Sequence, residues 1–240
     1  MSQPASGARA RPAQVRAVLF DLDGTLLDTA PDLGRALNAL RGEESLPPIA
    51  LPVIRPRVSD GATGLVQLGF PGASPERTEL LRQRLLVHYG SALALESRPF
   101  EGVPEMLAAL DGRGMHWGIV TNKSAAFTTP LLQQVGLAAG AAIIVSGDTT
   151  AQRKPHPEPL LHAARQLGLA PAHCVYVGDA ERDAQAASAA GMRMLVALFG
   201  YAEAARARAW THAGLLERPA QLLEWVDATG GEGRDATGTE

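Results

Sequence analysis

The strongest constraint on the fold is a stretch near the N-terminus in which an apolar run is followed directly by two acidic residues. Residues 18–20 are apolar and are expected to form a buried strand, after which come Asp21, Asp23 and the turn residue Gly24. In an open α/β sheet, reactive groups gather just beyond the carboxyl ends of the strands. Two neighbouring carboxylates repel each other unless a cation, a lysine or a shared proton offsets their charge. The stretch therefore predicts a metal site, an acid–base pair, or both.

The length and composition exclude several classes of protein. The chain has 240 residues, of which 46% are hydrophobic and 20% charged, as in ordinary globular proteins. The net charge of −3 gives no reason to expect nucleic acid or a membrane surface as a partner. A single cysteine, Cys174, cannot form an internal disulfide, which fits the cytoplasmic location that we expect. Residues 1–15 and 229–240 are predicted to be flexible tails.

Residues 31–97 carry helix and loop signals but no strand pattern. Thr29 is expected to cap a helix with apolar residues on one face as far as Leu40. A second long helix is expected to begin at Pro75, with Leu85 and Tyr89 on its apolar face. This segment interrupts the sheet to which residues 18–20 belong.

From residue 98 onward, predicted helices alternate with predicted strands. The strands are expected over residues 116–120, 142–145, 174–177 and 194–198. Such alternation implies a parallel sheet with helices on both faces. Polar clusters follow these strands and should meet at one edge of the sheet. The candidate site residues at that edge are Asp21, Asp23, Thr121, Asn122, Lys154, Asp179 and Asp183.

This set of side chains suits phosphoryl transfer. Asp21, Asp179 and a loop carbonyl could ligate Mg²⁺, which prefers carboxylate oxygens. The Thr121 hydroxyl and the Lys154 ammonium could hold a phosphate. One carboxylate could then attack phosphorus, while a second protonates the leaving alcohol and later deprotonates the attacking water.

Four clusters together resemble the four motifs of the haloacid dehalogenase-like hydrolases. They are Asp21-x-Asp23-Gly-Thr25, Thr121-Asn122, Lys154-Pro155 and Gly178-Asp179-x-x-x-Asp183. The resemblance spans residues 16–228. It implies a Rossmann-like catalytic core formed by residues 16–30 and 98–228, with residues 31–97 inserted as a helical cap.

The resemblance also implies roles for individual residues. Asp21 would be the nucleophile, and Asp23 would be the acid–base group, with its backbone carbonyl on the metal. Asp179 would bind Mg²⁺ directly, together with Asp21, and Asp183 would support these ligands without contacting the ion. The phosphate-binding residues would be Thr121, Asn122 and Lys154. One departure is Ala180, where relatives often carry serine or aspartate, and we expect this change to tune metal affinity without abolishing activity.

Within this superfamily, residues 21–32 and 100–104 resemble phosphoglycolate phosphatases. Residues 117–123 and Gly200-Tyr201 also resemble the N-acetylmuramic acid 6-phosphate phosphatases. Both substrates carry a carboxylate besides the phosphate, and we expect a cap arginine, Arg55 or Arg57, to bind it. The expected ligand is thus a small phosphorylated metabolite, bound by a monomer or homodimer.

Three other functions share parts of this pattern. A phospho-accepting signalling module also places Mg²⁺, a threonine and a lysine around an aspartate, but the helical insertion and Gly24-Thr25 argue against it. A dehalogenase needs no second acid, so Asp23 argues against that reaction. A sugar phosphomutase needs the same four clusters and differs in how the cap excludes water, so the sequence leaves it open.

Overall fold

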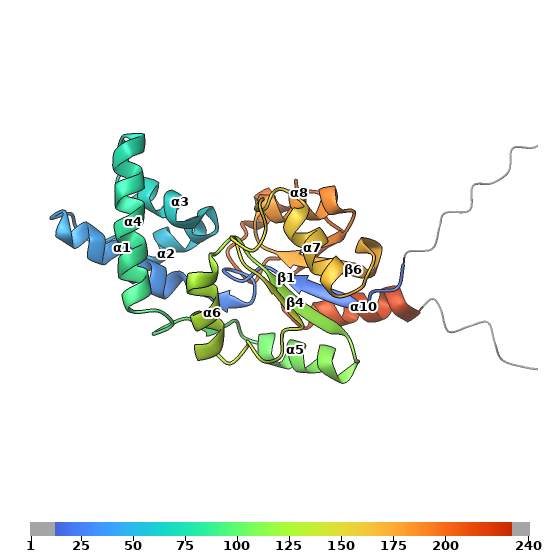
Figure 1. Ribbon diagram of the computed structural model, residues 1–240. Coiled ribbons are helices and arrows are strands. Elements are labelled where there is room, and N and C mark those ends of the chain that lie inside the picture. The colour runs from blue at the N-terminus through green and yellow to red at the C-terminus, as the bar shows by residue number, and fades with distance from the viewer. Residues whose placement is uncertain (1–12, 232–240) are drawn as a thin grey trace, which may run out of the picture.

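The structure is a computed structural model that describes residues 13–231. Its centre is a six-stranded sheet, in which every paired neighbour is parallel, in the order β5-β4-β1-β6-β7-β8 (Figure 1). The strands are β1 (Ala17–Phe20), β4 (His116–Val120), β5 (Ile143–Val145), β6 (Cys174–Gly178), β7 (Arg193–Ala197) and β8 (Gly214–Leu216). The predicted α/β fold with a parallel sheet is confirmed.

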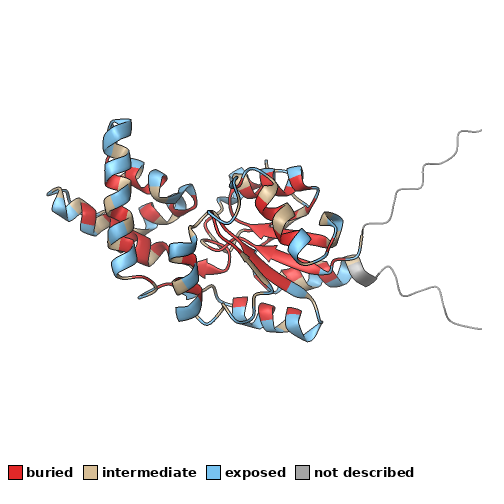
Figure 2. Ribbon diagram, viewed as in Figure 1, coloured by how far each residue is buried: buried red, intermediate tan, exposed pale blue. Residues whose placement is uncertain are grey.

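Alternate residues of β1 pack into cores on opposite faces of the sheet. Val18 and Phe20 belong to a core shared with the helical insertion and with helices α5, α6 and α10, whereas Ala17 and Leu19 pack with α7 and α8. This two-residue alternation is what a strand buried on both faces requires. Figure 2 shows the central strands buried over most of their length, with the start of β4 exposed. The covering helices are α5 (Val103–Gly112), α6 (Ala125–Gln134), α7 (Glu158–Gln166), α8 (Glu181–Ala190) and α10 (Gln221–Gly231), with a short α9 (Ala204–Ala207) before β8.

The helical insertion lies beside the sheet, at the left of Figure 1. It consists of α1 (Ala30–Glu43), α2 (Leu51–Ile54), the 3₁₀ helix η1 (Arg55–Asp60), α3 (Gly61–Gly69) and α4 (Pro75–Ser91). It joins the rest of the chain through β2 (Leu27–Asp28) and β3 (Arg98–Pro99), which pair antiparallel. The chain therefore enters and leaves the insertion at one place, while the domain boundaries at residues 31 and 97 stay a prediction.

The first helix of the insertion begins where the sequence indicates, but with a different cap. Thr29 is the N-cap residue of α1, yet its side chain makes no capping hydrogen bond. The backbone N–H groups of Thr29 and Ala30 instead donate to the Tyr201 hydroxyl, over 2.8 and 2.9 Å. A residue more than a hundred positions away therefore caps the helix, which frees the Thr29 hydroxyl for the site described below.

The tails differ in part from the prediction. Residues 1–12 and 232–240 lie outside the described residues. Val15, which the sequence places in the N-terminal tail, is buried in the core. Residues 229–231 continue α10 rather than starting a tail, and the Thr229 hydroxyl donates to the carbonyls of Trp225 and Val226. Among residues 13–231, no helix is both long and apolar enough to cross a membrane.

Candidate active site

The predicted site residues meet at the carboxyl edge of the sheet. Asp21 follows β1, Thr121 follows β4 and Asp179 follows β6, and β1 pairs with both of the other strands. Lys154 comes from the loop before α7, and Asp183 lies in the first turn of α8. All five side chains are buried, each with at most 3% of its residue surface exposed. The parallel register therefore brings together residues that are up to 162 positions apart, as the clusters in the sequence predict.

Lys154 lies between two of the acids. Its ammonium is 2.9 Å from Asp21 Oδ1 and 2.8 Å from Asp183 Oδ1. It also donates to the Tyr176 hydroxyl over 2.7 Å, and that hydroxyl donates to the Val120 carbonyl. Tyr176 is not among the predicted site residues. In the sequence it lies within the mainly apolar run of β6 and looks like a core residue.

Asn122 holds the backbone of Lys154 in place. Its side-chain amide donates to the Lys154 carbonyl over 2.8 Å and accepts from the Lys154 N–H over 3.0 Å. The peptide bond between Lys154 and Pro155 is cis. The amide is therefore occupied by the loop, while the predicted contact between Asn122 and a phosphate stays a prediction.

Three carboxylates form the acidic centre of the site. Asp21, Asp179 and Asp183 each present an oxygen within 4.8 Å of the others. Burial, and then the charges of Asp21 and Asp183, raises the pKa of Asp179 to about 8. Burial also raises the pKa of Asp183. Burial opposes ionisation of Asp21, but Lys154 and Arg182 outweigh it and lower its pKa. Such a crowded set of hard oxygen donors fits a divalent cation such as Mg²⁺.

Gly24 and Thr25 shape the turn beside this centre. Gly24 has a φ of +83°, and a Cβ at this position would collide with the Asp179 carboxylate. The Thr25 hydroxyl donates to Asp179 Oδ1 over 3.0 Å. The helical insertion adds a further contact, since the Ser59 hydroxyl donates to Asp179 Oδ2 over 2.5 Å. Arg182 of α8 in turn donates to the Ser59 carbonyl. The Asp179 carboxylate is therefore held by one hydroxyl from the sheet-bearing part and by one from the helical insertion.

Asp23 lies on the more open side of the site and is only partly buried. The Thr29 hydroxyl donates to Asp23 Oδ1 over 2.6 Å, and the Lys123 ammonium lies 3.0 Å from the same oxygen. Lys123 is absent from the predicted site, although it directly follows the Thr121-Asn122 pair and ends the run 117–123 that resembles the N-acetylmuramic acid 6-phosphate phosphatases. A carboxylate that a hydroxyl and an ammonium hold in position beside a cleft can exchange protons with a bound substrate.

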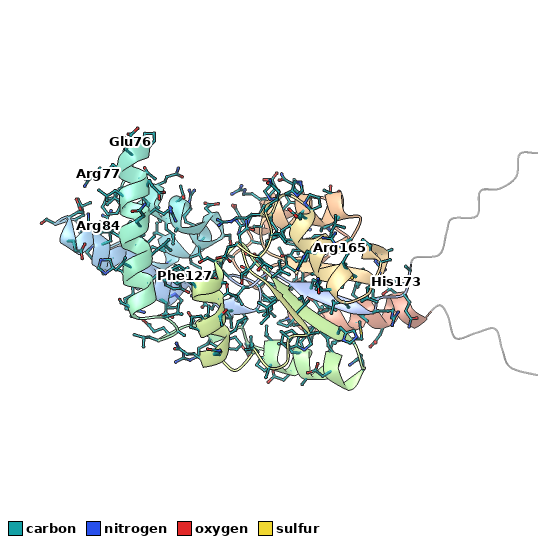
Figure 3. The ribbon with its side chains drawn as sticks, viewed as in Figure 1. Glu76, Arg77, Arg84, Phe127, Arg165 and His173 are labelled. Atoms are coloured by element: carbon teal, nitrogen blue, oxygen red, sulfur yellow. The ribbon has the colours of Figure 1, made fainter. Side chains whose placement is uncertain are left out.

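A cleft of about 330 Å³ opens between the helical insertion and this edge of the sheet. Asp21, Asp23 and Thr121 lie on its floor with Lys123. The insertion contributes Leu33, Val58, Arg82, Leu86 and Tyr89 to its walls, and the sheet-bearing part contributes Phe127, Arg153 and Arg182. Figure 3 shows Phe127 on α6, on the side that faces the insertion.

The two predicted substrate arginines have other partners. Arg55 forms an ion pair with Asp28 over 2.8 Å and lies over the Tyr201 ring. Arg57 forms an ion pair with Asp60 over 3.0 Å. Neither is among the described residues that line the cleft, where the guanidinium groups come from Arg82, Arg153 and Arg182 instead.

A family model described as haloacid dehalogenase-like hydrolase matches residues 15–191. The chain belongs to the haloacid dehalogenase-like hydrolases. The family model agrees with the resemblance of the four sequence motifs, and the predicted family membership is confirmed.

Several curated haloacid dehalogenase-like relatives are phosphatases. Phosphoglycolate phosphatase of Xanthomonas campestris pv. campestris (strain 8004) is 45% identical over 87% of this chain and 95% of the relative. N-acetylmuramic acid 6-phosphate phosphatase of Pseudomonas aeruginosa PAO1 is 39% identical over 89% of this chain and 96% of the relative. The prediction that the chain is a phosphatase of this superfamily is thereby confirmed.

Solved structures share the fold. The crystal structure of a predicted phosphoglycolate phosphatase from Haemophilus somnus 129PT superposes with a TM-score of 0.78, at 26% identity, over 89% of this chain and 98% of that chain. A putative phosphoglycolate phosphatase from Lactobacillus delbrueckii subsp. bulgaricus superposes with a TM-score of 0.81 at 19% identity. The helical insertion is therefore part of a haloacid dehalogenase-like fold that these structures share.

Proposed function

We propose that this protein is a Mg²⁺-dependent phosphomonoesterase that hydrolyses a small phosphorylated carboxylic acid, with 2-phosphoglycolate as the first candidate substrate. The observation that carries the proposal is the buried Asp21 carboxylate, held at the floor of a cleft by Lys154. The 45% identity to a phosphoglycolate phosphatase supports the choice of substrate.

Asp21 is proposed to be the nucleophile. The Leu22 N–H donates to its Oδ1 over 2.7 Å, and Lys154 adds a second donor to the same oxygen. These contacts fix the carboxylate and keep its pKa low, so it is ionised and oriented when the phosphate ester arrives. A carboxylate oxygen then bonds to phosphorus as the bond to the leaving alcohol breaks. Lys154 lies beside the same carboxylate, and Thr121 lines the same cleft as Asp21. Both are proposed to bind the phosphoryl oxygens.

Asp23 is proposed to handle both protons. In its acid form it gives a proton to the leaving alcohol oxygen, and as a carboxylate it then takes a proton from the water that attacks phosphorus. The second step releases inorganic phosphate and restores Asp21. Thr29 and Lys123 hold the carboxylate in place for this exchange.

The acidic centre is proposed to hold Mg²⁺ through Asp21, the Asp23 carbonyl and Asp179, with Asp183 orienting its neighbours. A bound Mg²⁺ supplies positive charge that stabilises the negative charge of the transferring phosphoryl group. Thr25 and Ser59 fix the Asp179 carboxylate by hydrogen bonds to its two oxygens.

One feature of the cleft favours N-acetylmuramic acid 6-phosphate as a second candidate. Its wall includes the apolar side chains of Leu33, Leu86 and Phe127, besides the cationic groups. A two-carbon acid offers little surface to such a wall, whereas a larger acetylated sugar acid could cover it. The 39% identity to a phosphatase for this substrate points the same way.

The test is a substrate panel compared by kcat/KM in the presence of Mg²⁺. It contains 2-phosphoglycolate, N-acetylmuramic acid 6-phosphate, hexose phosphates and p-nitrophenyl phosphate. We expect one of the two carboxylated esters to give the highest value, with inorganic phosphate as the product. Preference for a hexose phosphate, or an isomerised sugar phosphate as the product, would contradict the proposal. A single stoichiometric phosphorylation without turnover would indicate a signalling module.

A further inference from the structure

Tyr89 carries a buried hydroxyl that the mechanism above does not use. The residue lies near the end of α4 in the helical insertion and has 1% of its surface exposed. Its hydroxyl has no hydrogen-bond acceptor among the described residues, although the side chain lines the cleft beside Lys123. Buried polar groups in proteins are nearly always hydrogen-bonded, so an unpaired one in a cleft indicates that a ligand supplies the partner.

The surroundings of Tyr89 place it on the leaving-group side of the site. The Lys123 ammonium lies 4.6 Å from the centre of the Tyr89 ring and 3.0 Å from Asp23 Oδ1. Asp23 is the group proposed to protonate the leaving alcohol. The part of the substrate that lies beside Tyr89 is therefore the alcohol and not the phosphate.

The chemistry around this hydroxyl favours an anion. Burial raises the pKa of Tyr89, so the phenol stays protonated and can donate. An ammonium has three donors, and the contact of Lys123 with Asp23 accounts for one of them. Two neighbouring donors of different kinds, one of them charged, match the two oxygens of a carboxylate.

We propose that the Tyr89 hydroxyl, together with Lys123, binds a carboxylate on the leaving alcohol and so selects phosphate esters of hydroxy acids. This inference rests on the proposed phosphatase function. It gives the role that was expected of Arg55 or Arg57 to a tyrosine of the same insertion. A carboxylate bound in this way joins the insertion to the sheet-bearing part, because Tyr89 belongs to one and Lys123 to the other.

The test is the Tyr89→Phe variant, which removes the hydroxyl and keeps the ring. The ring packs against Phe127 at a centroid distance of 5.5 Å, and phenylalanine preserves that contact. Each carboxylated ester is compared with an analogue that lacks the carboxylate. 2-Phosphoglycolate is paired with 2-hydroxyethyl phosphate, and N-acetylmuramic acid 6-phosphate with N-acetylglucosamine 6-phosphate.

For the carboxylated ester that the wild type prefers, we expect kcat/KM to fall by about tenfold or more, as for loss of a hydrogen bond to a charged group. The loss should appear mainly in KM. The value for the matched analogue should stay unchanged, so the selectivity ratio falls by the same factor. An unchanged ratio would overturn the inference, as would an equal loss with both esters.

Tyr201→Phe is the matched control, because it removes a hydroxyl that caps α1 and does not line this cleft. It should leave the selectivity ratio as in the wild type, and an equal fall of the ratio in this variant would also overturn the inference. A wild-type enzyme with no preference for either carboxylated ester would contradict the proposed substrate class itself. A wild-type preference that survives in Tyr89→Phe would contradict the role of Tyr89 alone.

Discussion

Lys154 shows how much of the site depends on single contacts. Its ammonium touches one oxygen of Asp21 and one of Asp183, and all three side chains are buried. Buried charges of one sign are unfavourable unless opposite charge compensates them. One lysine and the nearby Arg182 face three carboxylates, so the three cannot all be ionised without further positive charge, and the pKa of Asp179 is raised to about 8. This imbalance is the physical reason to expect a divalent cation.

A prediction at this scale concerns Arg57. Because its guanidinium pairs with Asp60 and lies outside the cleft lining, Arg57→Ala should leave KM for carboxylated esters within about twofold of the wild-type value, as for a weak exposed ion pair. Steady-state kinetics with 2-phosphoglycolate and N-acetylmuramic acid 6-phosphate check this. A large rise of KM for these esters, with p-nitrophenyl phosphate unaffected, would restore Arg57 as the carboxylate-binding residue.

The residues that could be predicted from the sequence are those in recognisable clusters. Asp21, Lys154 and Asp179 follow strand ends or precede a proline, so their position and chemistry are visible in the linear pattern. Ser59 and Tyr89 give no such signal, because each belongs to the insertion and reaches the site only when the two parts of the chain pack together.

At the scale of elements, one buried carboxylate links the segment that enters the insertion to the segment that leaves it by hydrogen bonds. Asp32, in the first turn of α1, is fully buried and accepts hydrogen bonds from the Ser97 N–H over 2.9 Å and from the Ser97 hydroxyl over 2.6 Å. It also accepts from Arg35. The start of the insertion is thereby attached to its end, just before β3.

Asp32→Asn should lower the free energy of unfolding by about 1–3 kcal/mol at pH 7, because an amide N–H then faces buried donors. Burial acts to raise the pKa of Asp32, but the Ser97 and Arg35 hydrogen bonds outweigh it and lower the value in the folded state. Its stabilising effect is therefore complete above the unfolded pKa of about 3.9 and is lost as pH falls through the lower folded pKa.

Urea unfolding at pH 7 and at about pH 3 checks this prediction, and the difference between wild type and variant should shrink at the lower pH. Asp227→Asn is the control, because Asp227 forms an exposed ion pair with Arg113 over 3.0 Å. That change should alter stability by at most about 1 kcal/mol. If Asp32→Asn lowers the free energy of unfolding equally at both pH values, the charge of Asp32 is not the source of its stabilising effect.

Elements could be predicted where their pattern is long or strongly apolar. The strand over residues 116–120 agrees with β4, and the strand at 174–177 is one residue shorter than β6. The short β2, β3 and β8 have two or three residues each and give too little periodicity to be recognised. Their existence depends on pairing with neighbours, and β8 forms only because β7 lies beside it.

At the scale of the whole molecule, the insertion and the sheet edge enclose the reacting groups between them. We expect EDTA to abolish turnover and Mg²⁺ to restore it, because the acidic centre needs a cation to bind a phosphate dianion. Mg²⁺ should also raise the melting temperature, since an ion that binds only the folded state stabilises it.

Thermal unfolding at matched ionic strength, with Na⁺ in place of Mg²⁺, separates specific binding from screening. Asp179→Asn is the matched variant, and its melting temperature should respond much less to Mg²⁺ because one proposed ligand carboxylate is lost. Full activity in EDTA, or an equal response of wild type and variant, would contradict the assignment of the metal site.

The most direct measurement of the central claim is the covalent state of Asp21 during turnover. In Asp23→Asn with p-nitrophenyl phosphate, the leaving group needs no acid, but the later water attack lacks its base, so the phosphorylated enzyme should accumulate. Acid quenching, digestion and mass spectrometry should then find one phosphoryl group on Asp21, and none when Asp21→Asn is added. Continued release of p-nitrophenol without a phosphorylated peptide, or a phosphoryl group on another residue, would contradict the account.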